Sequence, residues 1–244
     1  MTTYRIDLAY DGTDFHGYAK QPNVRTVQGE FETALFRMTG EVETVVAGRT
    51  DRGVHATGQV LSFKTTQDYD TGMVLRSLNR QLGPEISVSS VAVVEDSFDA
   101  RFSAIGRAYT YLVLNRDVPD PFLARTSLHY RTPLDVELMN KGIACLVGLH
   151  DFAAFCRKAP NRSTERRLDL VEWTNRGSGL LALDVAASSF CHQMVRSLAQ
   201  VSIEVGRGKI QPEAVQEILE SRNRRQGKGA ARAHGLTLVS VKYG

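Results

Sequence analysis

Apolar and polar residues follow one another along the first hundred positions in a pattern that predicts strands and helices in turn. Residues 4–10 alternate as in a strand, and Thr26 offers an N-cap for a helix with a regular apolar face that ends at Gly40. Residues 45–47 and 60–64 predict two more strands, residues 74–82 a helix, and residues 86–94 a last strand. This order of elements is typical of a ferredoxin-like unit.

The second half repeats that order with longer connections. Residues 107–115 alternate as a strand, and Thr132, Pro133 and Asp135 predict a capped helix start with proline at its first position. Further elements are expected as a strand pair at 168–173 and 180–186, helices at 194–205 and after Pro212, and a strand at 236–241. We therefore predict an α+β protein with two ferredoxin-like domains, residues 1–104 and 105–244.

A loop between two predicted strands concentrates glycine and charge in the sequence AGRTDRGVHATGQV, residues 47–60. Glycines on both sides of Asp51 permit tight turns, and Arg49 and Arg52 place positive charge beside its carboxylate. Such a carboxylate stays ionised, which suits a nucleophile or a base better than a proton donor. A lone loop aspartate more often only shapes a turn, and His55 can serve either a structural hydrogen bond or the site.

Charge along the chain is local rather than global, because the formal net charge is only +3. Two short stretches carry the excess of basic residues, and such clusters suit a polyanionic partner, although each can also be a solvated surface. The first basic cluster is Arg157, Lys158, Arg162, Arg166 and Arg167, and the second is Arg222, Arg224, Arg225, Lys228 and Arg232.

Several classes of protein are disfavoured. The cysteines Cys145, Cys156 and Cys191 form no CxxC pair, which predicts neither a disulfide framework nor a zinc site and fits a reducing cytoplasm. Neither an export segment nor a run of about 18 apolar residues is visible, so no membrane association is expected. Phosphate-binding glycine motifs and clustered metal ligands are missing as well, which predicts no nucleotide cofactor and no metal.

Residues 48–56, GRTDRGVHA, resemble the GRTDAGVHA signature of the TruA family of tRNA pseudouridine synthases, with Arg52 where that family usually has alanine. Other family motifs resemble stretches along almost the whole chain, although Arg232 stands where the family commonly has proline. These stretches are FHGY at 15–18, TVQ at 26–28, RAYTY at 107–111, GLHDF at 148–152, FCHQMVR at 190–196 and GLTL at 235–238.

The resemblance implies a fold, a reaction and a set of site residues. The fold would be two pseudo-symmetric ferredoxin-like halves around a central cleft, acting as a homodimer on tRNA without a cofactor. Asp51 would be the catalytic aspartate, Arg196 the arginine paired with it, and Tyr109 the tyrosine packed beneath the target base. Arg49, Tyr109 and His55 would form the substrate-binding set. The reaction would be isomerisation of uridine to pseudouridine at positions 38 to 40 of the anticodon arm, in the cytoplasm.

Two other classes remain as alternatives. A non-catalytic tRNA-binding or RNA-chaperone module could use the same basic clusters, but a pure binder gains nothing from presenting an anion such as Asp51 to phosphates. A nucleoside hydrolase or glycosidase would release free base and needs a second carboxylate or a metal, which the sequence around Asp51 does not offer.

Overall fold

The computed structural model describes residues 1–40, 43–157 and 162–244. The chain divides into two compact units, of which unit 1 is Met1–Ile105 with Leu238–Gly244, and unit 2 is Gly106–Thr237. The sequence analysis placed residues 105–244 together in one domain. The structure instead gives the end of the chain to unit 1, because the last strand packs there.

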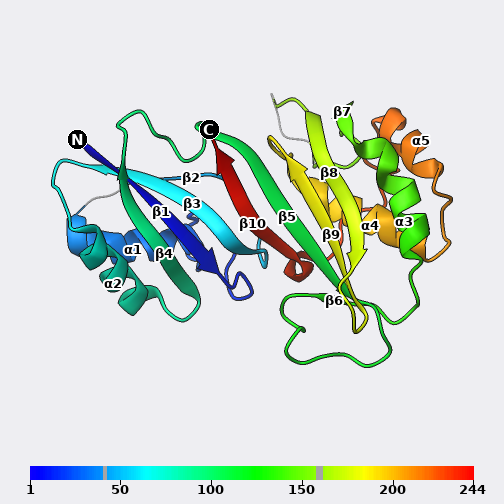
Figure 1. Cartoon of the computed structure of the whole chain (residues 1–244), viewed down its shortest axis with the longest axis horizontal. Coiled ribbons are helices and arrows are strands. Elements are labelled where there is room, and N and C mark those ends of the chain that lie inside the picture. The colour runs from blue at the N-terminus through cyan, green and yellow to red at the C-terminus, as the bar shows by residue number, and fades with distance from the viewer. Residues whose placement is uncertain (41–42, 158–161) are drawn as a thin grey trace. The chain divides into compact units, whose positions relative to one another are not determined.

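Unit 1 follows the predicted order of elements, as Figure 1 shows in blue to green. Its elements are β1 (Thr2–Tyr10), α1 (Val27–Thr39), β2 (Thr44–Val46), β3 (His55–Thr65), α2 (Thr71–Leu82) and β4 (Ile86–Val94). β1 lies between β4 and β3 and pairs antiparallel with both, and β2 pairs with β3. The predicted first strand, both helices and the strand at 86–94 are confirmed.

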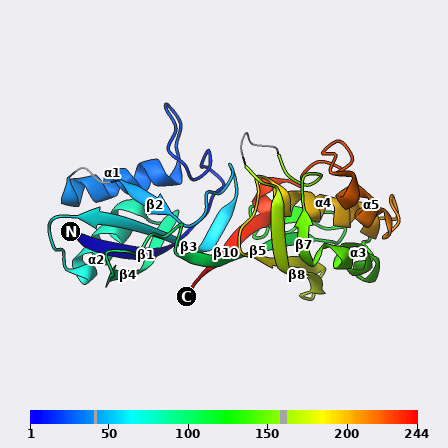
Figure 2. The same cartoon turned by 90° about the horizontal axis from the view of Figure 1, so that it is seen from above.

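The packing of unit 1 follows from the sequence pattern. Residues Tyr4, Ile6 and Leu8 on β1 are all buried, as the alternation predicts. Helix α1 lies along one face of these strands (Figure 2) and buries Phe31 and Leu35. As predicted, the Thr26 side chain accepts a hydrogen bond from a backbone N–H in the first turn of α1, and Gly40 ends the helix with φ 82°.

The final strand, β10 (Leu236–Tyr243), is anchored in unit 1 by contacts near its end. The Tyr243 hydroxyl donates to the Ala100 carbonyl at 2.8 Å, and its ring packs against Phe98 with centroids 5.1 Å apart. Gly58 of β3 lies so close to the Val239 carbonyl that a Cβ would overlap it. These contacts explain why residues 238–244 belong to unit 1.

In unit 2 the strands pair antiparallel in the order β5-β9-β8-β7, and the helices form one group beside them (Figure 1). The strands are β5 (Ala104–Leu114), β6 (Leu128–His129), β7 (Gly148–Asp151), β8 (Glu165–Asn175) and β9 (Leu180–Ala187), and the helices are α3 (Val136–Ile143), α4 (Met194–Gly206) and α5 (Ala214–Ser221). The predicted α+β class is confirmed, whereas the short strands β6 and β7 were not predicted.

The start of α3 differs from the prediction. Asp135, not Thr132, caps this helix, because its side chain accepts from the Leu138 N–H at 3.0 Å. The Asn115 side chain holds the segment before α3, because it donates to the Thr132 carbonyl and accepts from the Leu134 N–H. The helix therefore starts later than predicted, because Asn115, a residue distant in the sequence, binds the backbone around Thr132.

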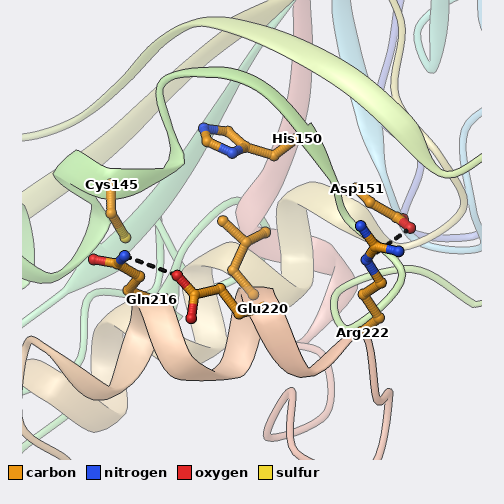
Figure 3. Close-up of a pocket in the computed structure, with 7 residues that line it drawn as sticks. Cys145, His150, Asp151, Gln216, Glu220 and Arg222 are labelled. Atoms are coloured by element: carbon orange, nitrogen blue, oxygen red, sulfur yellow. Dashed lines mark hydrogen bonds and ion pairs between the residues drawn. The ribbon is translucent and has the colours of Figure 1, made fainter.

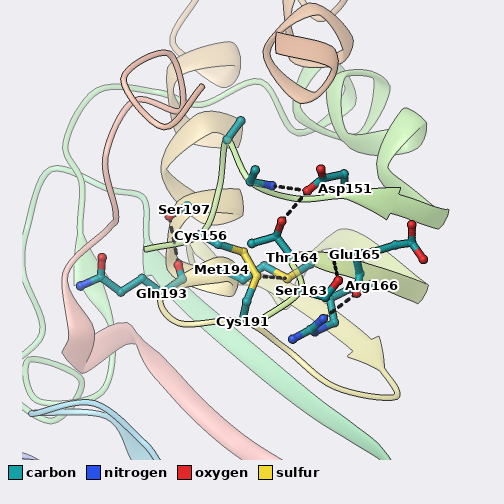
Figure 4. Close-up of a disulfide and its surroundings, with 12 residues drawn as sticks. Asp151, Cys156, Ser163, Thr164, Glu165, Arg166, Cys191, Gln193, Met194 and Ser197 are labelled. Carbon is teal, nitrogen blue, oxygen red and sulfur yellow. Dashed lines mark hydrogen bonds between the residues drawn. A yellow bond between two sulfur atoms is a disulfide. The ribbon is translucent and has the colours of Figure 1, made fainter. Parts of the chain in front are cut away.

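A disulfide joins Cys156 to Cys191 in unit 2, with their Cα atoms 5.7 Å apart (Figure 4). It connects the segment that follows β7 to the residues just before α4, and the Arg157 N–H donates to the His192 carbonyl beside it. The expectation of unpaired cysteines is wrong for this pair, and the cysteine argument for a reducing compartment loses its basis. Cys145 is a free thiol.

In the described ranges, no helix is both long enough and apolar enough to cross a membrane.

Candidate functional site

The loop between β2 and β3 presents charged side chains on a firmly held backbone. Arg49 and Arg52 are exposed, and Asp51 is half-buried between them. Gly53 adopts φ 75°, a left-handed conformation that suits glycine, and the Val54 N–H donates back to the Asp51 carbonyl at 3.1 Å. The loop is therefore a tight turn with Asp51 at its start, as the glycine pattern predicted.

Residues 12–18, which include the FHGY motif, pack directly on this turn. A Cβ at Gly12 would overlap the Val54 carbonyl, so the close approach requires glycine there. The Tyr18 N–H donates to the Thr50 carbonyl at 3.1 Å. The main chain next to Asp51 is thus fixed by a second segment of unit 1.

A chain of buried side-chain hydrogen bonds supports the same turn from below. The Gln59 amide donates to the Gly48 carbonyl at 2.7 Å and to the Tyr10 hydroxyl at 3.2 Å, and that hydroxyl lies 2.9 Å from Thr50 Oγ1. Tyr10, Thr50 and Gln59 were not predicted from the sequence as part of the site. The signal that could have found them is a polar glutamine beside the apolar run of β3, at a position that is fully buried.

The His55 side chain contacts the segment of Asp11 and Gly12. Its side chain is almost fully buried, and its Nδ1 accepts from the Gly12 N–H at 3.1 Å. Asp11 Oδ1 also lies 3.1 Å from Nδ1, so this ring nitrogen is close to both the Gly12 N–H and the Asp11 carboxylate. Of the two possibilities kept open for His55, the geometry favours the structural one over a contact with substrate.

Tyr109 lies on β5 in unit 2 and is half-buried. Its ring packs perpendicular to the Phe190 ring, with centroids 5.1 Å apart and planes at 87°. Tyr111, two residues further along the strand, is fully buried and donates to the Arg232 carbonyl at 2.8 Å. Burial raises the pKa of the Tyr111 hydroxyl, which therefore remains a donor. Tyr109 is thus the more accessible of the two tyrosines.

Arg196 lies in the first turn of α4, and the backbone of Ala231 orients it. Its Nε donates to the Ala231 carbonyl at 2.7 Å, and the Ala231 N–H donates to the Arg196 carbonyl at 2.9 Å. The N-cap residue of α4, Gln193, has φ 64° and supplies no side-chain cap. A cation at this end of a helix opposes the helix dipole, so Arg196 is placed at an electrostatic cost.

Each basic cluster makes a hydrogen bond to residues at or near the start of α4. The Arg157 N–H bonds to His192, as described above, and Arg224 Nη1 donates to Ser197 Oγ at 2.8 Å. Arg157, Arg162, Arg167, Arg222, Arg225, Lys228 and Arg232 are exposed, Arg166 and Arg224 are half-buried, and Lys158 lies outside the described residues. One residue of each basic cluster is therefore hydrogen-bonded next to or within the first turn of α4, the helix that carries Arg196.

The two departures from the family pattern fit the structure. Arg52 is exposed on the turn, where a long side chain meets no packing constraint. Arg232 has φ −58° and ψ 144°, values that proline also adopts. Neither substitution changes the backbone that carries the candidate residues.

A separate pocket of about 230 Å³ lies in unit 2 (Figure 3). Its charged groups have partners among the lining residues, since Arg222 Nε lies 3.4 Å from Asp151 Oδ2 and the neutral Gln216 amide donates to Glu220 at 2.8 Å. Across the described ranges, no three histidine, cysteine or acidic side chains are grouped closely enough to hold a metal ion.

The predicted site residues thus form two groups. The first group, in unit 1, is Arg49, Asp51 and His55. The second group, in unit 2, is Tyr109, which packs against Phe190, and Arg196 of α4, which donates to Ala231.

Comparisons with known proteins identify the family. The family model described as tRNA pseudouridine synthase matches residues 8–103 and 143–244. The chain is 44% identical over 250 residues to tRNA pseudouridine synthase A of Chloroflexus aurantiacus, covering 100% of this chain and 89% of that protein. It is 42% identical to the protein of the same name from Frankia casuarinae (100% and 90% covered) and 40% identical to that from Moorella thermoacetica (100% of both). With its GRTD turn and these full-length relatives, the chain belongs to the tRNA pseudouridine synthase family.

Proposed function

We propose that this protein converts uridines at positions 38 to 40 of the tRNA anticodon arm to pseudouridine, with Asp51 as the catalytic residue. Family membership supports the reaction on tRNA, and the Asp51 turn is the observation that supports the residue assignment. The reaction breaks the bond between N1 and C1′ and joins C1′ to C5 of the same ring. Because substrate and product are isomers, the chemistry requires neither a redox cofactor nor net hydrolysis.

Asp51 suits this reaction because its carboxylate is half-buried on a turn whose neighbouring residues are fixed. Three routes are open to a carboxylate so placed: attack on C1′, addition at C6, or deprotonation of a glycal-like intermediate. Each of them requires an ionised carboxylate held at a defined position, which is how a preoriented group lowers a barrier.

Tyr109 and Arg196 complete the proposed catalytic set. The half-buried Tyr109 ring, which packs perpendicular to Phe190, is assigned to stacking with the target base. Arg196 is held through Nε, so its terminal nitrogens are preoriented to pair with a carboxylate, here assigned to Asp51. Arg49, exposed on the turn, is assigned to the flipped nucleotide and the space it leaves.

The target base must leave its stack before it can react, at a cost of a few kcal/mol. Stacking on Tyr109 and phosphate contacts from the basic clusters offset that cost. Recognition of this kind depends on tRNA shape and charge more than on sequence.

We also propose a homodimer that works where tRNA is found, in the cytoplasm. Large apolar side chains are left exposed in the long connection between β5 and β6, where Phe122 is 93% and Val118 69% exposed. Such residues are typical of surfaces that a partner covers, and a second copy of the chain is the proposed partner.

Replacing Asp51 by asparagine tests the proposed function. Asp51→Asn keeps the size of the side chain and removes its charge and its nucleophilic oxygen pair. Turnover should fall by orders of magnitude, because the carboxylate acts in the chemical step, while tRNA affinity should stay constant or rise slightly as an anion leaves the surface. Tritium release from C5-labelled uridine in tRNA, run beside filter binding, measures both quantities.

Asp68→Asn is the matched control, since it makes the same charge change at an exposed position of unit 1. Pseudouridine formation by Asp51→Asn at the rate of the control would remove Asp51 from the mechanism. Tight tRNA binding by the parent protein without any tritium release would favour the non-catalytic RNA-binding module.

A further inference from the structure

The buried hydrogen-bond chain beneath the GRTD turn joins three side chains that are far apart in the sequence. Gln59 is fully buried, Tyr10 is 4% exposed and Thr50 is 7% exposed. Their polar atoms are therefore removed from water and depend on one another for hydrogen bonds.

The direction of the chain follows from the chemistry of its groups. The Gln59 amide nitrogen can only donate, and it does so to the Gly48 carbonyl and to the Tyr10 oxygen, which uses both of its protons. The Tyr10 oxygen thus accepts from Gln59, and its own proton is available for Thr50 Oγ1. Burial raises the pKa of Tyr10 to about 12, so this proton stays in place at any pH at which the protein works.

The chain ends on both sides of the turn that carries Asp51. One end holds the carbonyl of Gly48 and the other holds the side chain of Thr50, whose own carbonyl accepts from Tyr18. The backbone immediately before Asp51 is thus held through its side chain and through its main chain.

We propose that Gln59 and Tyr10 are positioning residues, which hold the turn through Thr50 and Gly48 so that the Asp51 carboxylate keeps its catalytic orientation. This inference rests on the proposed role of Asp51. A small displacement of a catalytic group can cost about a hundredfold in rate. The hydrogen bonds to Gly48 and Thr50 hold the turn at two points and so oppose such a displacement.

Tyr10→Phe tests the proposal, because it deletes one oxygen and keeps the ring. We expect kcat to fall about tenfold or more while the KM for tRNA changes little, since the defect lies in orientation and not in binding. Hydrogen exchange at the amides of residues 48–54 should speed up in the same variant, and this readout does not depend on activity.

Tyr4→Phe is the matched control on the same strand. Tyr4 is also fully buried, and its hydroxyl donates to the Tyr69 carbonyl and accepts from the Tyr69 N–H, so the variant loses comparable buried hydrogen bonds. It should lose thermal stability like Tyr10→Phe but keep kcat and the slow exchange of residues 48–54. An equal loss of kcat in the two variants, both folded at the assay temperature, would overturn the positioning role.

Thr50 gives an independent check by conservative rescue. Thr50→Val keeps the shape and removes the hydroxyl, so kcat should fall as in Tyr10→Phe, whereas Thr50→Ser keeps the hydroxyl and should recover most of the rate. Equal kcat in the two Thr50 variants would contradict the proposal. If Asp51→Asn were active, the catalytic assignment would fail, and the exchange measurement would still report whether Tyr10 holds the turn.

Discussion

At the scale of single residues, Arg196 differs from an ordinary surface arginine in how its side chain is held. Its Nε donates to Ala231, and because the guanidinium is planar this bond also restricts the orientation of the two terminal nitrogens. Lysine has a single side-chain nitrogen, so it cannot both donate to the Ala231 carbonyl and present separate charged nitrogens to a carboxylate.

Arg196→Lys should therefore damage turnover far more than tRNA binding, by about a hundredfold or more in kcat, because the positive charge remains but its orientation is lost. Arg207→Lys is the control, at the other end of α4. Single-turnover rates and filter binding on both variants measure the two effects. Near-normal kcat in Arg196→Lys would take Arg196 out of the site and shift its role to Arg49.

At the scale of elements, the disulfide between Cys156 and Cys191 links the segment after β7 to the start of α4, the helix that carries Arg196. Closing a loop across 35 residues of separation restricts the unfolded chain and contributes up to about 4 kcal/mol to stability. Reduction should therefore lower the denaturant concentration at the unfolding midpoint.

The measurement is denaturant unfolding with and without a thiol reductant. The double variant Cys156→Ser, Cys191→Ser should unfold at one midpoint under both conditions, because it has no bond to reduce. If the unsubstituted protein also shows a single midpoint, the bond makes no contribution to stability.

Elements whose signals are local were predictable from the sequence, and those that depend on distant partners were not. Thr26 and Gly40 bound α1 because a cap and a stop act within a few residues. The start of α3 was misplaced because Asn115, twenty or so positions earlier, holds the segment around Thr132. The same reason explains the missed pairing of Cys156 with Cys191.

The candidate site shows the same division. The turn at Asp51 could be predicted from the sequence, because its glycines and charges are neighbours along the chain. Tyr10 and Gln59 could not, since each is an ordinary strand residue until the fold brings it to Thr50 and Gly48. The burial of His55 and its bond to Gly12 could not be predicted either, because a motif reveals neither of them.

At the scale of the whole molecule, charge is arranged so that a protein with a net charge of only +3 carries strongly basic stretches on unit 2. If these stretches contact phosphates, the logarithm of tRNA affinity should fall linearly with the logarithm of salt concentration, by about 0.7 to 0.9 per contact. The double variant Arg225→Ala, Lys228→Ala should flatten that slope by about 1.5.

The control removes the same number of charges elsewhere. Lys20 and Lys141 are exposed and paired with Glu32 and Glu213, so replacing both by alanine should leave the slope as it is. Filter binding over a range of salt concentrations gives the slopes. Equal slopes for the two double variants would place the second basic cluster away from the RNA.

Because β10 returns to unit 1, the fold has a consequence for folding during translation. Residues 238–244 are translated only after the whole of unit 2, yet β3 needs them as a neighbour in its sheet. A nascent chain that has completed residues 1–105 therefore exposes an unpaired stretch of β3 while more than a hundred residues are still to be added. Unit 1 is therefore the first unit to be started and the last to be completed, because residues 238–244 are made after all of unit 2.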